Sequence, residues 1–206
     1  MQFDLTLDEG VYLVKLARRS IMAEFDNSNV SIDDASEKSN KLCGVFVTLN
    51  RMRVESKELR GCIGYPFPIK PLVEAVRDVA KLAAFEDPRF PRVVKDEMND
   101  IVIEVSVLTP PEPVKVEDSK EYPERVKVGV DGLIVKRGYR SGLLLPQVAT
   151  EWGWDSEELL FQCCLKAGLQ PDAWLLKDTE VSKFQAIIFG EKTPNGEVIR
   201  EETSVC

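Results

Sequence analysis

A thiol and a guanidinium stand two residues apart in the segment 59–65, Leu-Arg-Gly-Cys-Ile-Gly-Tyr. If this segment is an extended strand, its side chains alternate between two faces, and Arg60 and Cys62 then point the same way. A fixed positive charge beside a cysteine favours the thiolate, which is the nucleophilic and metal-binding form. The spacing therefore predicts Cys62 and Arg60 as candidate catalytic residues.

Two glycines flank this cysteine. Gly61 and Gly64 lack Cβ atoms, so a ligand could approach the backbone closely, and the amides there could accept an anion. We predict both as ligand-binding residues. An architectural interpretation stays open: the glycines would serve strand geometry, Cys62 would be a packed core residue, and Arg60 would pair with a surface carboxylate.

The chain contains no histidine, which limits the chemistry that it can perform. A Cys–His dyad, a His-containing triad and an imidazole zinc site are excluded. Acid–base chemistry must come from carboxylates, Cys, Lys or Tyr, so activation of Cys62 would depend on Arg60, a helix terminus or backbone donors. The five cysteines lack the paired spacing of a zinc site, so we predict no metal site, and the sequence names no cofactor.

A second group of candidates lies in the segment 87–91, Asp-Pro-Arg-Phe-Pro. An acid, a fork-shaped donor and an aromatic ring could clamp the carboxylate or phosphate of a ligand. This predicts Asp87 and Arg89 as ligand-binding residues. In the structural alternative, Asp87 tethers the loop, Arg89 bonds the carbonyls at a helix end, and Phe90 fills the core.

Two further ligand-binding residues are predicted at Ser106 and Glu151. Ser106 shares a strand face with Glu104, and if this strand lies beside the 59–65 segment, either side chain could reach Arg60 or Cys62. Glu151 precedes a pair of tryptophans, whose indole rings either line a pocket or are buried. For the tryptophans we favour burial.

The composition is that of an ordinary globular protein, with 44% hydrophobic and 30% charged residues among 206. A net charge of −8 disfavours contact with phosphate backbones, so we expect no nucleic-acid partner. No apolar run reaches the about 18 residues of a membrane span, and no secretory signal is present, so we expect no membrane association. An odd number of cysteines without C-x-x-C pairs favours a cytoplasmic location.

Apolar periodicity predicts the secondary structure. A capping box at Thr6 and Glu9 opens an amphipathic helix over 7–25. The other expected elements are a hairpin of strands over 44–49 and 59–63, a helix over 71–84, a strand over 101–108, a hairpin over 128–145, a helix over 155–167 and a strand over 184–190. Residues beyond 192 are polar and are expected to fray. Irregular alternation of helices and strands indicates an α+β fold with a mainly antiparallel sheet.

Several motifs together resemble the AMMECR family, named after the Alport syndrome, mental retardation, midface hypoplasia and elliptocytosis chromosomal region. They are Leu-Arg-Gly-Cys-Ile-Gly at 59–64, Asp-Pro-Arg-Phe-Pro at 87–91, Gly-Val-Asp-Gly at 129–132, Leu-Pro-Gln-Val-Ala at 145–149 and Glu-Trp-Gly-Trp at 151–154. The resemblance covers roughly residues 5 to 190. Arg92 departs from it, because the family often carries a second proline there.

The resemblance implies a fold of two subdomains. The larger would contain both termini and a five-stranded antiparallel sheet flanked by helices, and the smaller would be a hairpin plus helices. We place the larger at 1–125 with 181–206 and the smaller, inserted one at 126–180. The family has no settled activity, but its members are sometimes fused or genomically linked to Memo-like and radical-SAM proteins, which implies a shared pathway.

Two functions stay open, and the sequence does not decide whether the protein is an enzyme. The first is an enzyme or small-ligand binder, with a cleft around the 59–64 motif and an unknown small molecule as its partner. The alternative is a non-catalytic regulatory or protein-interaction module in a pathway linked to Memo-like and radical-SAM proteins.

Overall fold

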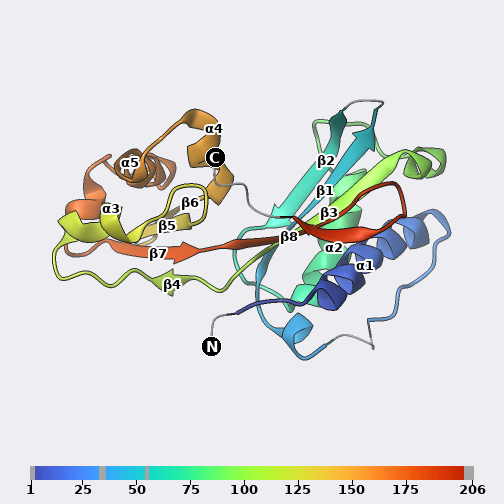
Figure 1. Cartoon of the computed structure of the whole chain (residues 1–206), viewed down its shortest axis with the longest axis horizontal. Coiled ribbons are helices and arrows are strands. Elements are labelled where there is room, and N and C mark those ends of the chain that lie inside the picture. The colour runs from blue at the N-terminus through green and yellow to red at the C-terminus, as the bar shows by residue number, and fades with distance from the viewer. Residues whose placement is uncertain (1–2, 33–35, 54–55, 202–206) are drawn as a thin grey trace. The chain divides into compact units, whose positions relative to one another are not determined.

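The computed structural model describes residues 3–32, 36–53 and 56–201 (Figure 1). The described chain divides into two compact units, one formed by residues 3–108 with 187–201 and the other by residues 109–186. Each unit has its own sheet and its own apolar core. The fold class is therefore α+β, as predicted.

A five-stranded antiparallel sheet forms the centre of the first unit, in the strand order β2-β1-β3-β8-β9. Its strands are β1 (Gly44–Met52), β2 (Lys57–Tyr65), β3 (Ile101–Leu108), β8 (Ala186–Glu191) and β9 (Val198–Glu201). β1 pairs with β2 on one side and with β3 on the other. The predicted first hairpin is confirmed, and β2, which carries the 59–64 motif, is an edge strand.

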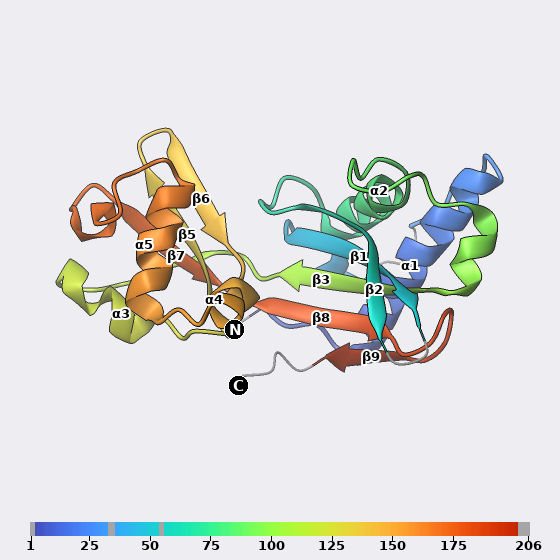
Figure 2. The same ribbon diagram turned by 90° about the horizontal axis from the view of Figure 1, so that it is seen from above.

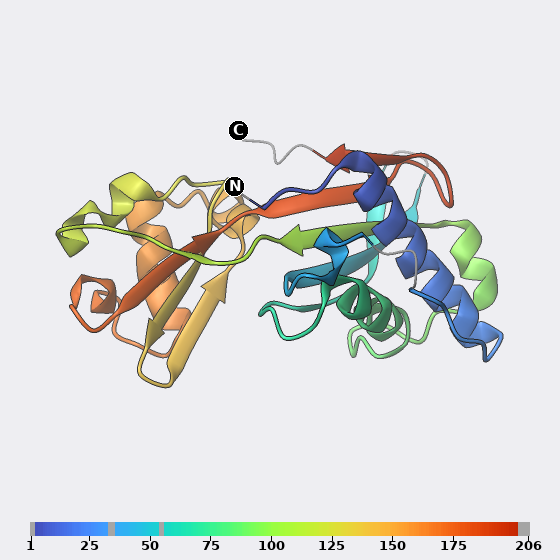
Figure 3. The ribbon, with the colours of Figure 1, turned by 90° about the horizontal axis from the view of Figure 1, so that it is seen from below.

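Two helices, α1 (Leu7–Phe25) and α2 (Leu72–Phe85), pack on the same face of this sheet (Figures 2 and 3). Their apolar stripes join the inward-facing residues of β1, β3 and β8 in one core. Because strand residues alternate, every second residue faces the opposite side, which we call the outer face. The outer face includes Phe46, Thr48, Cys62, Gly64, Glu104 and Ser106.

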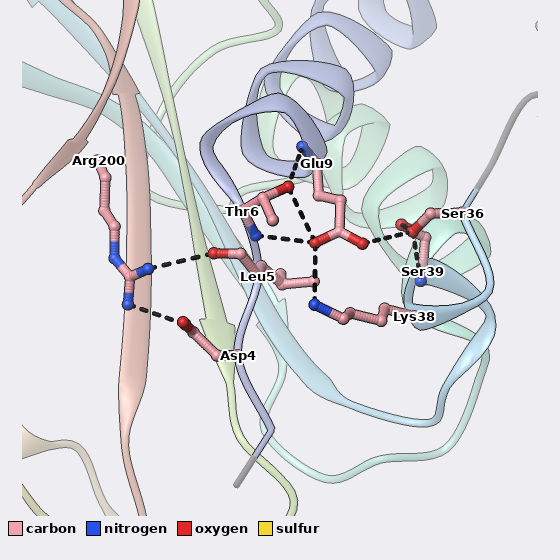
Figure 4. Close-up of polar contacts among 8 residues, drawn as sticks. All are labelled: Asp4, Leu5, Thr6, Glu9, Ser36, Lys38, Ser39 and Arg200. Atoms are coloured by element: carbon pink, nitrogen blue, oxygen red, sulfur yellow. Dashed lines mark hydrogen bonds and ion pairs between the residues drawn. The ribbon is translucent and has the colours of Figure 1, made fainter. Parts of the chain in front are cut away.

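The N-terminus of α1 is capped as the sequence predicted. The backbone N–H of Glu9 donates to Thr6 Oγ1 at 3.3 Å, and the backbone N–H of Thr6 donates to Glu9 Oε2 at 2.8 Å. Ser36 Oγ donates to Glu9 Oε1 at 2.9 Å, and Lys38 Nζ lies 3.5 Å from Oε2 (Figure 4). These bonds tie the start of α1 to the chain around η1 (Lys38–Asn40).

The second unit is built on a four-stranded antiparallel sheet in the order β4-β7-β5-β6. Its elements are β4 (Glu112–Pro113), η3 (Ser119–Glu121), α3 (Tyr122–Arg125), β5 (Gly132–Arg137), β6 (Arg140–Leu144), α4 (Pro146–Trp152), α5 (Ser156–Lys166), η4 (Ala173–Leu175) and β7 (Glu180–Phe184). Leu159 and Cys163 of α5 pack with Leu133 and Val135 of β5 in its core. Gly142 permits this contact, because a Cβ there would lie 2.4 Å from the backbone nitrogen of Ala167.

The second unit extends beyond the expected range 126–180. β4 pairs with β7, and β7 pairs with β5, so residues 109–125 and 181–186 belong with the four-stranded sheet. The sequence predicts a short edge strand at 114–116, and the observed strand β4 is Glu112–Pro113, two residues earlier, with the N–H of Val114 still donating to the carbonyl oxygen of Val181 at 2.9 Å.

The expectation that residues beyond 192 fray is wrong for 198–201. These residues form β9, which pairs with β8 in the register Ile188↔Glu201 and Gly190↔Ile199. Backbone pairing orders this polar edge strand, whereas the expectation considered side chains alone. Among the residues that the structure describes, no helix is long and apolar enough to cross a membrane.

Candidate functional site

The strand that carries Cys62 contains a β-bulge, and the bulge separates the two candidate catalytic residues. Gly61 pairs with Leu49 and Leu59 pairs with Asn50, so Arg60 is an extra residue opposite no partner. A bulge sets two residues of one strand against one of its neighbour and breaks the alternation of faces. Arg60 therefore turns toward the helix-covered side with Gly61. The prediction that it shares a face with Cys62 is wrong.

Arg60 is occupied by a carboxylate instead. Only 7% of the residue is exposed, and its Nε and Nη2 donate to the two oxygens of Glu97 at 2.9 and 3.0 Å. Arg51 binds the same carboxylate. Arg60 Nη1 is buried and has no hydrogen-bond partner among the described residues. The arginine thus joins β2 to η2 (Lys95–Asn99), and its charge is directed at Glu97.

The cation that contacts Cys62 is Arg89. Its Nη2 donates to the carbonyl oxygen of Cys62 at 3.0 Å, and the N–H of Cys62 donates to Asp87 Oδ2 at 2.9 Å. Asp87 also accepts from Arg89 Nε and Nη2 at 3.0 and 2.7 Å. Since β2 is an edge strand, these two side chains satisfy backbone groups that have no neighbouring strand.

This arrangement fixes the protonation state of Asp87. Its side chain is only 2% exposed, and the hydrogen bonds from Arg89, with that from the Cys62 backbone, hold the pKa of Asp87 well below its ordinary value despite burial. In turn the Asp87 carboxylate raises the pKa of Arg89. Asp87 therefore tethers its loop as expected. Arg89, however, bonds a backbone carbonyl of strand β2 rather than the carbonyls at a helix end.

Protein atoms fill the space beside both glycines of the motif. A Cβ on Gly61 would lie 2.2 Å from the carbonyl oxygen of Ala83, where α2 approaches β2. A Cβ on Gly64 would lie 2.4 Å from the ring of Phe46, its cross-strand partner on the outer face. The close approach that the sequence predicted is made by the protein's own helix and aromatic ring.

Three polar side chains form a row across the outer face: Cys62 on β2, Thr48 on β1 and Glu104 on β3. Thr48 pairs with Cys62 on one side and with Glu104 on the other. Its hydroxyl donates to Cys62 Sγ at 3.3 Å. Two cross-strand steps separate Cys62 from Glu104, a Cα distance of about 10 Å. Ser106 joins this row by donating to Glu104 Oε1 at 3.3 Å.

Glu104 has an unusual environment for a carboxylate. Burial and the nearby charge of Glu201 raise its pKa, against the opposing effects of Lys57 and the hydrogen bond from Ser106. A Cβ on Gly190 would lie 2.8 Å from Glu201 Oε1 and 3.9 Å from Glu104 Cγ, so both side chains lean over this glycine. A raised pKa brings a carboxyl group closer to the range in which it can serve as a general acid.

An ion pair between the two edge strands shows that the sheet curls toward its outer face. Lys57 Nζ of β2 lies 3.5 Å from Glu201 Oε1 of β9, although three strands separate β2 from β9. In a flat sheet the backbones of β2 and β9 would be about 19 Å apart, since the backbones of neighbouring strands are about 4.8 Å apart. The outer face is therefore concave, and the row of polar side chains lies within it.

Glu151 belongs to the second unit, on α4, and its side chain is exposed. The rings of Trp152 and Trp154 stack with centroids 6.1 Å apart. Trp154 packs against the core of the unit, but Trp152 is 70% exposed, so the expected burial is wrong for Trp152. Helix α4 ends at Trp152, and Gly153, with a left-handed φ of +66°, caps it. The chain turns at this glycine, between the exposed ring of Trp152 and the packed ring of Trp154.

Sequence reasoning missed two residues of this region, Thr48 and Glu97. Thr48 becomes visible only through the register of the first hairpin, which places it opposite Cys62. Glu97 lies in a short 3-10 helix whose position depends on tertiary packing. Among the described residues, no three Cys, Asp or Glu side chains are grouped as a metal site would require.

The fold and the motif-bearing edge strand define a known class of protein. The family model of AMMECR1 matches residues 14–189, and the chain belongs to this family.

Individual relatives agree over almost the whole chain. Protein MJ0810 of Methanocaldococcus jannaschii is 50% identical over 198 residues, which are 96% of this chain and 98% of the relative. Protein PF1979 of Pyrococcus furiosus is 54% identical over 196 residues, which are 93% and 92% of the two chains. The crystal structure of uncharacterized protein PH0010 from Pyrococcus horikoshii matches with a TM-score of 0.79 at 50% identity, covering 97% of this chain and 99% of that one. The family therefore identifies the fold without naming a reaction.

Proposed function

We propose that the concave outer face binds a small electrophilic carbonyl compound, with Cys62 as the nucleophile and Glu104 as the general acid. The observation that carries this proposal is the row of Cys62, Thr48 and Glu104, which sets a thiol and a carboxyl group of raised pKa on one face. In a chain without histidine, a carboxyl group is the natural proton donor.

The surroundings of Cys62 support its role as nucleophile. It is half-buried, whereas Cys43, Cys163 and Cys164 are buried. The Thr48 hydroxyl orients the sulfur through its hydrogen bond. Burial raises the pKa of the Cys43 thiol to about 11 and that of Cys163 to about 12. Burial also raises the pKa of the Cys164 thiol. Among the four cysteines that the structure describes, Cys62 is therefore the one whose thiol burial does not hold back, and we assign it as the nucleophile.

The proposed step conserves charge and atoms. The thiolate sulfur of Cys62 forms a bond to the electrophilic carbon, and the displaced π electrons move to the carbonyl oxygen. That oxygen takes the proton of Glu104, which becomes a carboxylate facing Lys57. The Cα atoms of Cys62 and Glu104 are about 10 Å apart with Thr48 between them, so the carbonyl group would lie over Thr48 to meet both side chains.

The test is adduct formation with a panel of enone-bearing fragments, followed by intact-mass spectrometry in a Cys206→Ser background. We expect one adduct, at Cys62, with a rate that falls at least about tenfold in Glu104→Gln, since general acids contribute about 10²–10⁴. Glu58→Gln is the matched control, because this carboxylate is 59% exposed and pairs with Arg53. Equal rates in Glu104→Gln and Glu58→Gln would exclude the proposed acid.

One observation favours the alternative, a protein-interaction module. Leu42, Phe67 and Ile69 are 53%, 40% and 62% exposed, and a β-bridge between Leu42 and Pro71 brings their segments together. Exposed apolar side chains that gather in this way are typical of protein contacts. The link of the family to Memo-like and radical-SAM proteins names two partners to test. An Ile69→Asp variant that loses such a partner while Cys62→Ser keeps it would favour this function.

We also propose a cytoplasmic location and no nucleic-acid partner. All four cysteines that the structure describes are free, as expected in a reducing compartment. The net charge of −8 opposes phosphate backbones.

A further inference from the structure

We propose that a cavity of the first unit, away from the outer face of the sheet, binds a small anionic ligand with an apolar body. The cavity has a volume of about 950 Å³ and lies between α1, η2 and the turn from β8 to β9. This volume is within the range of about 300–1,000 Å³ that small-molecule sites occupy. None of its lining residues belongs to the Cys62 row, so the inference is independent of the function proposed above.

One stripe of α1 forms a wall of this cavity. Tyr12, Lys15, Arg19 and Met22 line it, and their spacing of three, four and three residues places them on one side of the helix. Tyr12 and Met22 also pack against the core. The stripe thus presents an apolar residue at each end and two cations between them, which suits a ligand with one charged group and one apolar part.

One arginine that lines the cavity is buried, and its charge is already balanced. Arg18 is only 8% exposed, and its Nε and Nη2 donate to the Glu191 carboxylate at 2.7 and 2.6 Å. It also donates to the carbonyl oxygens of Met98 and Ile101 at 3.2 and 2.6 Å. Arg18 therefore lines the cavity, but its charge is not available to a ligand.

Two lining cations stay available. Lys95 pairs with Asp26 at 2.7 Å, but Lys15 and Arg19 have neither an ion pair nor a hydrogen bond among the described residues. Among the lining residues that the structure describes, Asp96 alone is acidic. In a chain of net charge −8, this leaves a local excess of positive charge at the wall. A guanidinium binds carboxylate or phosphate groups with two parallel hydrogen bonds.

The turn from β8 to β9 forms the opposite wall with Pro194 and Asn195. Asn195 has φ +56°, a left-handed conformation that asparagine tolerates better than most residues. A hydrogen bond of 2.9 Å from the N–H of Gly196 to the carbonyl of Thr193 holds this turn. The wall offers one apolar ring and one amide to the ligand.

Binding of phenyl phosphate and phenylacetate, with benzyl alcohol as the neutral analogue, tests the proposal by calorimetry and by chemical shift changes of the full chain. We expect saturable binding of at least one anion, about tenfold weaker in Arg19→Gln, unchanged in Cys62→Ser, and weaker at high salt. Lys41→Gln is the matched control, since it removes an exposed charge outside the cavity. The preferred anion identifies the ligand class as phosphate or carboxylate.

Any of three results would overturn the proposal. The protein could bind benzyl alcohol as tightly as the anions, the Arg19→Gln and Lys41→Gln variants could bind the anions with equal affinity, or binding could fail to saturate up to about 10 mM. Arg19 is exposed and has no ion pair with any residue that the structure describes, so its replacement should leave the fold intact, and Lys15→Gln provides a second variant with the same expectation.

Discussion

Replacement of Asp87 by asparagine is expected to destabilise the first unit strongly, although the two side chains have nearly the same shape. Asp87 accepts four hydrogen bonds. Its Oδ1 receives the backbone N–H and Nε of Arg89, and its Oδ2 receives the N–H of Cys62 and Arg89 Nη2. An amide keeps one oxygen, so either orientation of the asparagine loses one backbone bond and one side-chain bond.

The magnitude follows from the exposure of each partner. A hydrogen bond to a charged group contributes about 1.5–3 kcal/mol when it is buried, which applies to the backbone N–H groups. The guanidinium of Arg89 is 54% exposed, so its bond contributes at most about 0.5 kcal/mol. Asp87→Asn should therefore lower the free energy of unfolding by about 2–3 kcal/mol.

Urea unfolding at pH 7 measures this loss, with Glu86→Gln as the neighbouring control. Glu86 pairs with Arg92 at 2.9 Å, but both side chains are about 60% exposed, so its loss should cost less than about 0.5 kcal/mol. A loss in Asp87→Asn no larger than in Glu86→Gln would refute the role of Asp87 as the anchor of strand β2.

The same variant should change the dependence of stability on pH. The folded protein holds the pKa of Asp87 below its ordinary value of 3.8, so the unfolded chain binds more protons between the two values and stability rises with pH there. The contribution of Asp87 is complete above about pH 5 and is lost as pH falls below 3.8. The difference between wild type and Asp87→Asn should therefore shrink on acidification, and a constant difference would contradict this linkage.

Three further variants test other parts of the account. Gly61→Ala should cost about 2–3 kcal/mol in urea unfolding, because its Cβ would meet the carbonyl of Ala83; a neutral effect would contradict the contact. Glu104→Gln should gain stability relative to wild type as pH rises above 4.5, since the raised pKa of Glu104 makes its ionisation costly in the folded state. Parallel dependence of the two unfolding free energies on pH would oppose this. Glu191→Gln should cost about 3–5 kcal/mol by leaving Arg18 buried without its carboxylate, and full retention of the melting temperature would argue against a buried pair.

Helix α1 and strand β3 could be predicted because their local patterns agree with their tertiary environment. A capping box and a single apolar stripe mark α1, and β3 shows one fully apolar face and apolar residues at both ends of the other, as fits its central place in the sheet. The AMMECR resemblance implied the five-stranded sheet, and the family match confirms the resemblance.

The geometry around Cys62 could not be predicted in the same way. Strict alternation placed Arg60 beside Cys62, but a bulge depends on how the neighbouring strand pairs, which one strand's sequence does not encode. An isolated glycine inside a strand, here Gly61, is the local signal for a bulge. Thr48 became a candidate only once the hairpin register was known.

The rate at which iodoacetamide alkylates Cys62 tests the central claim most directly. In a Cys206→Ser background, peptide mass spectrometry at pH 7 would compare the folded protein with the urea-unfolded chain, whose thiols have the ordinary pKa of about 8.5. A nucleophile on the concave outer face predicts that folded Cys62 reacts faster than the unfolded thiol, and that Thr48→Val lowers this rate. A folded rate no faster than the unfolded rate would contradict the claim.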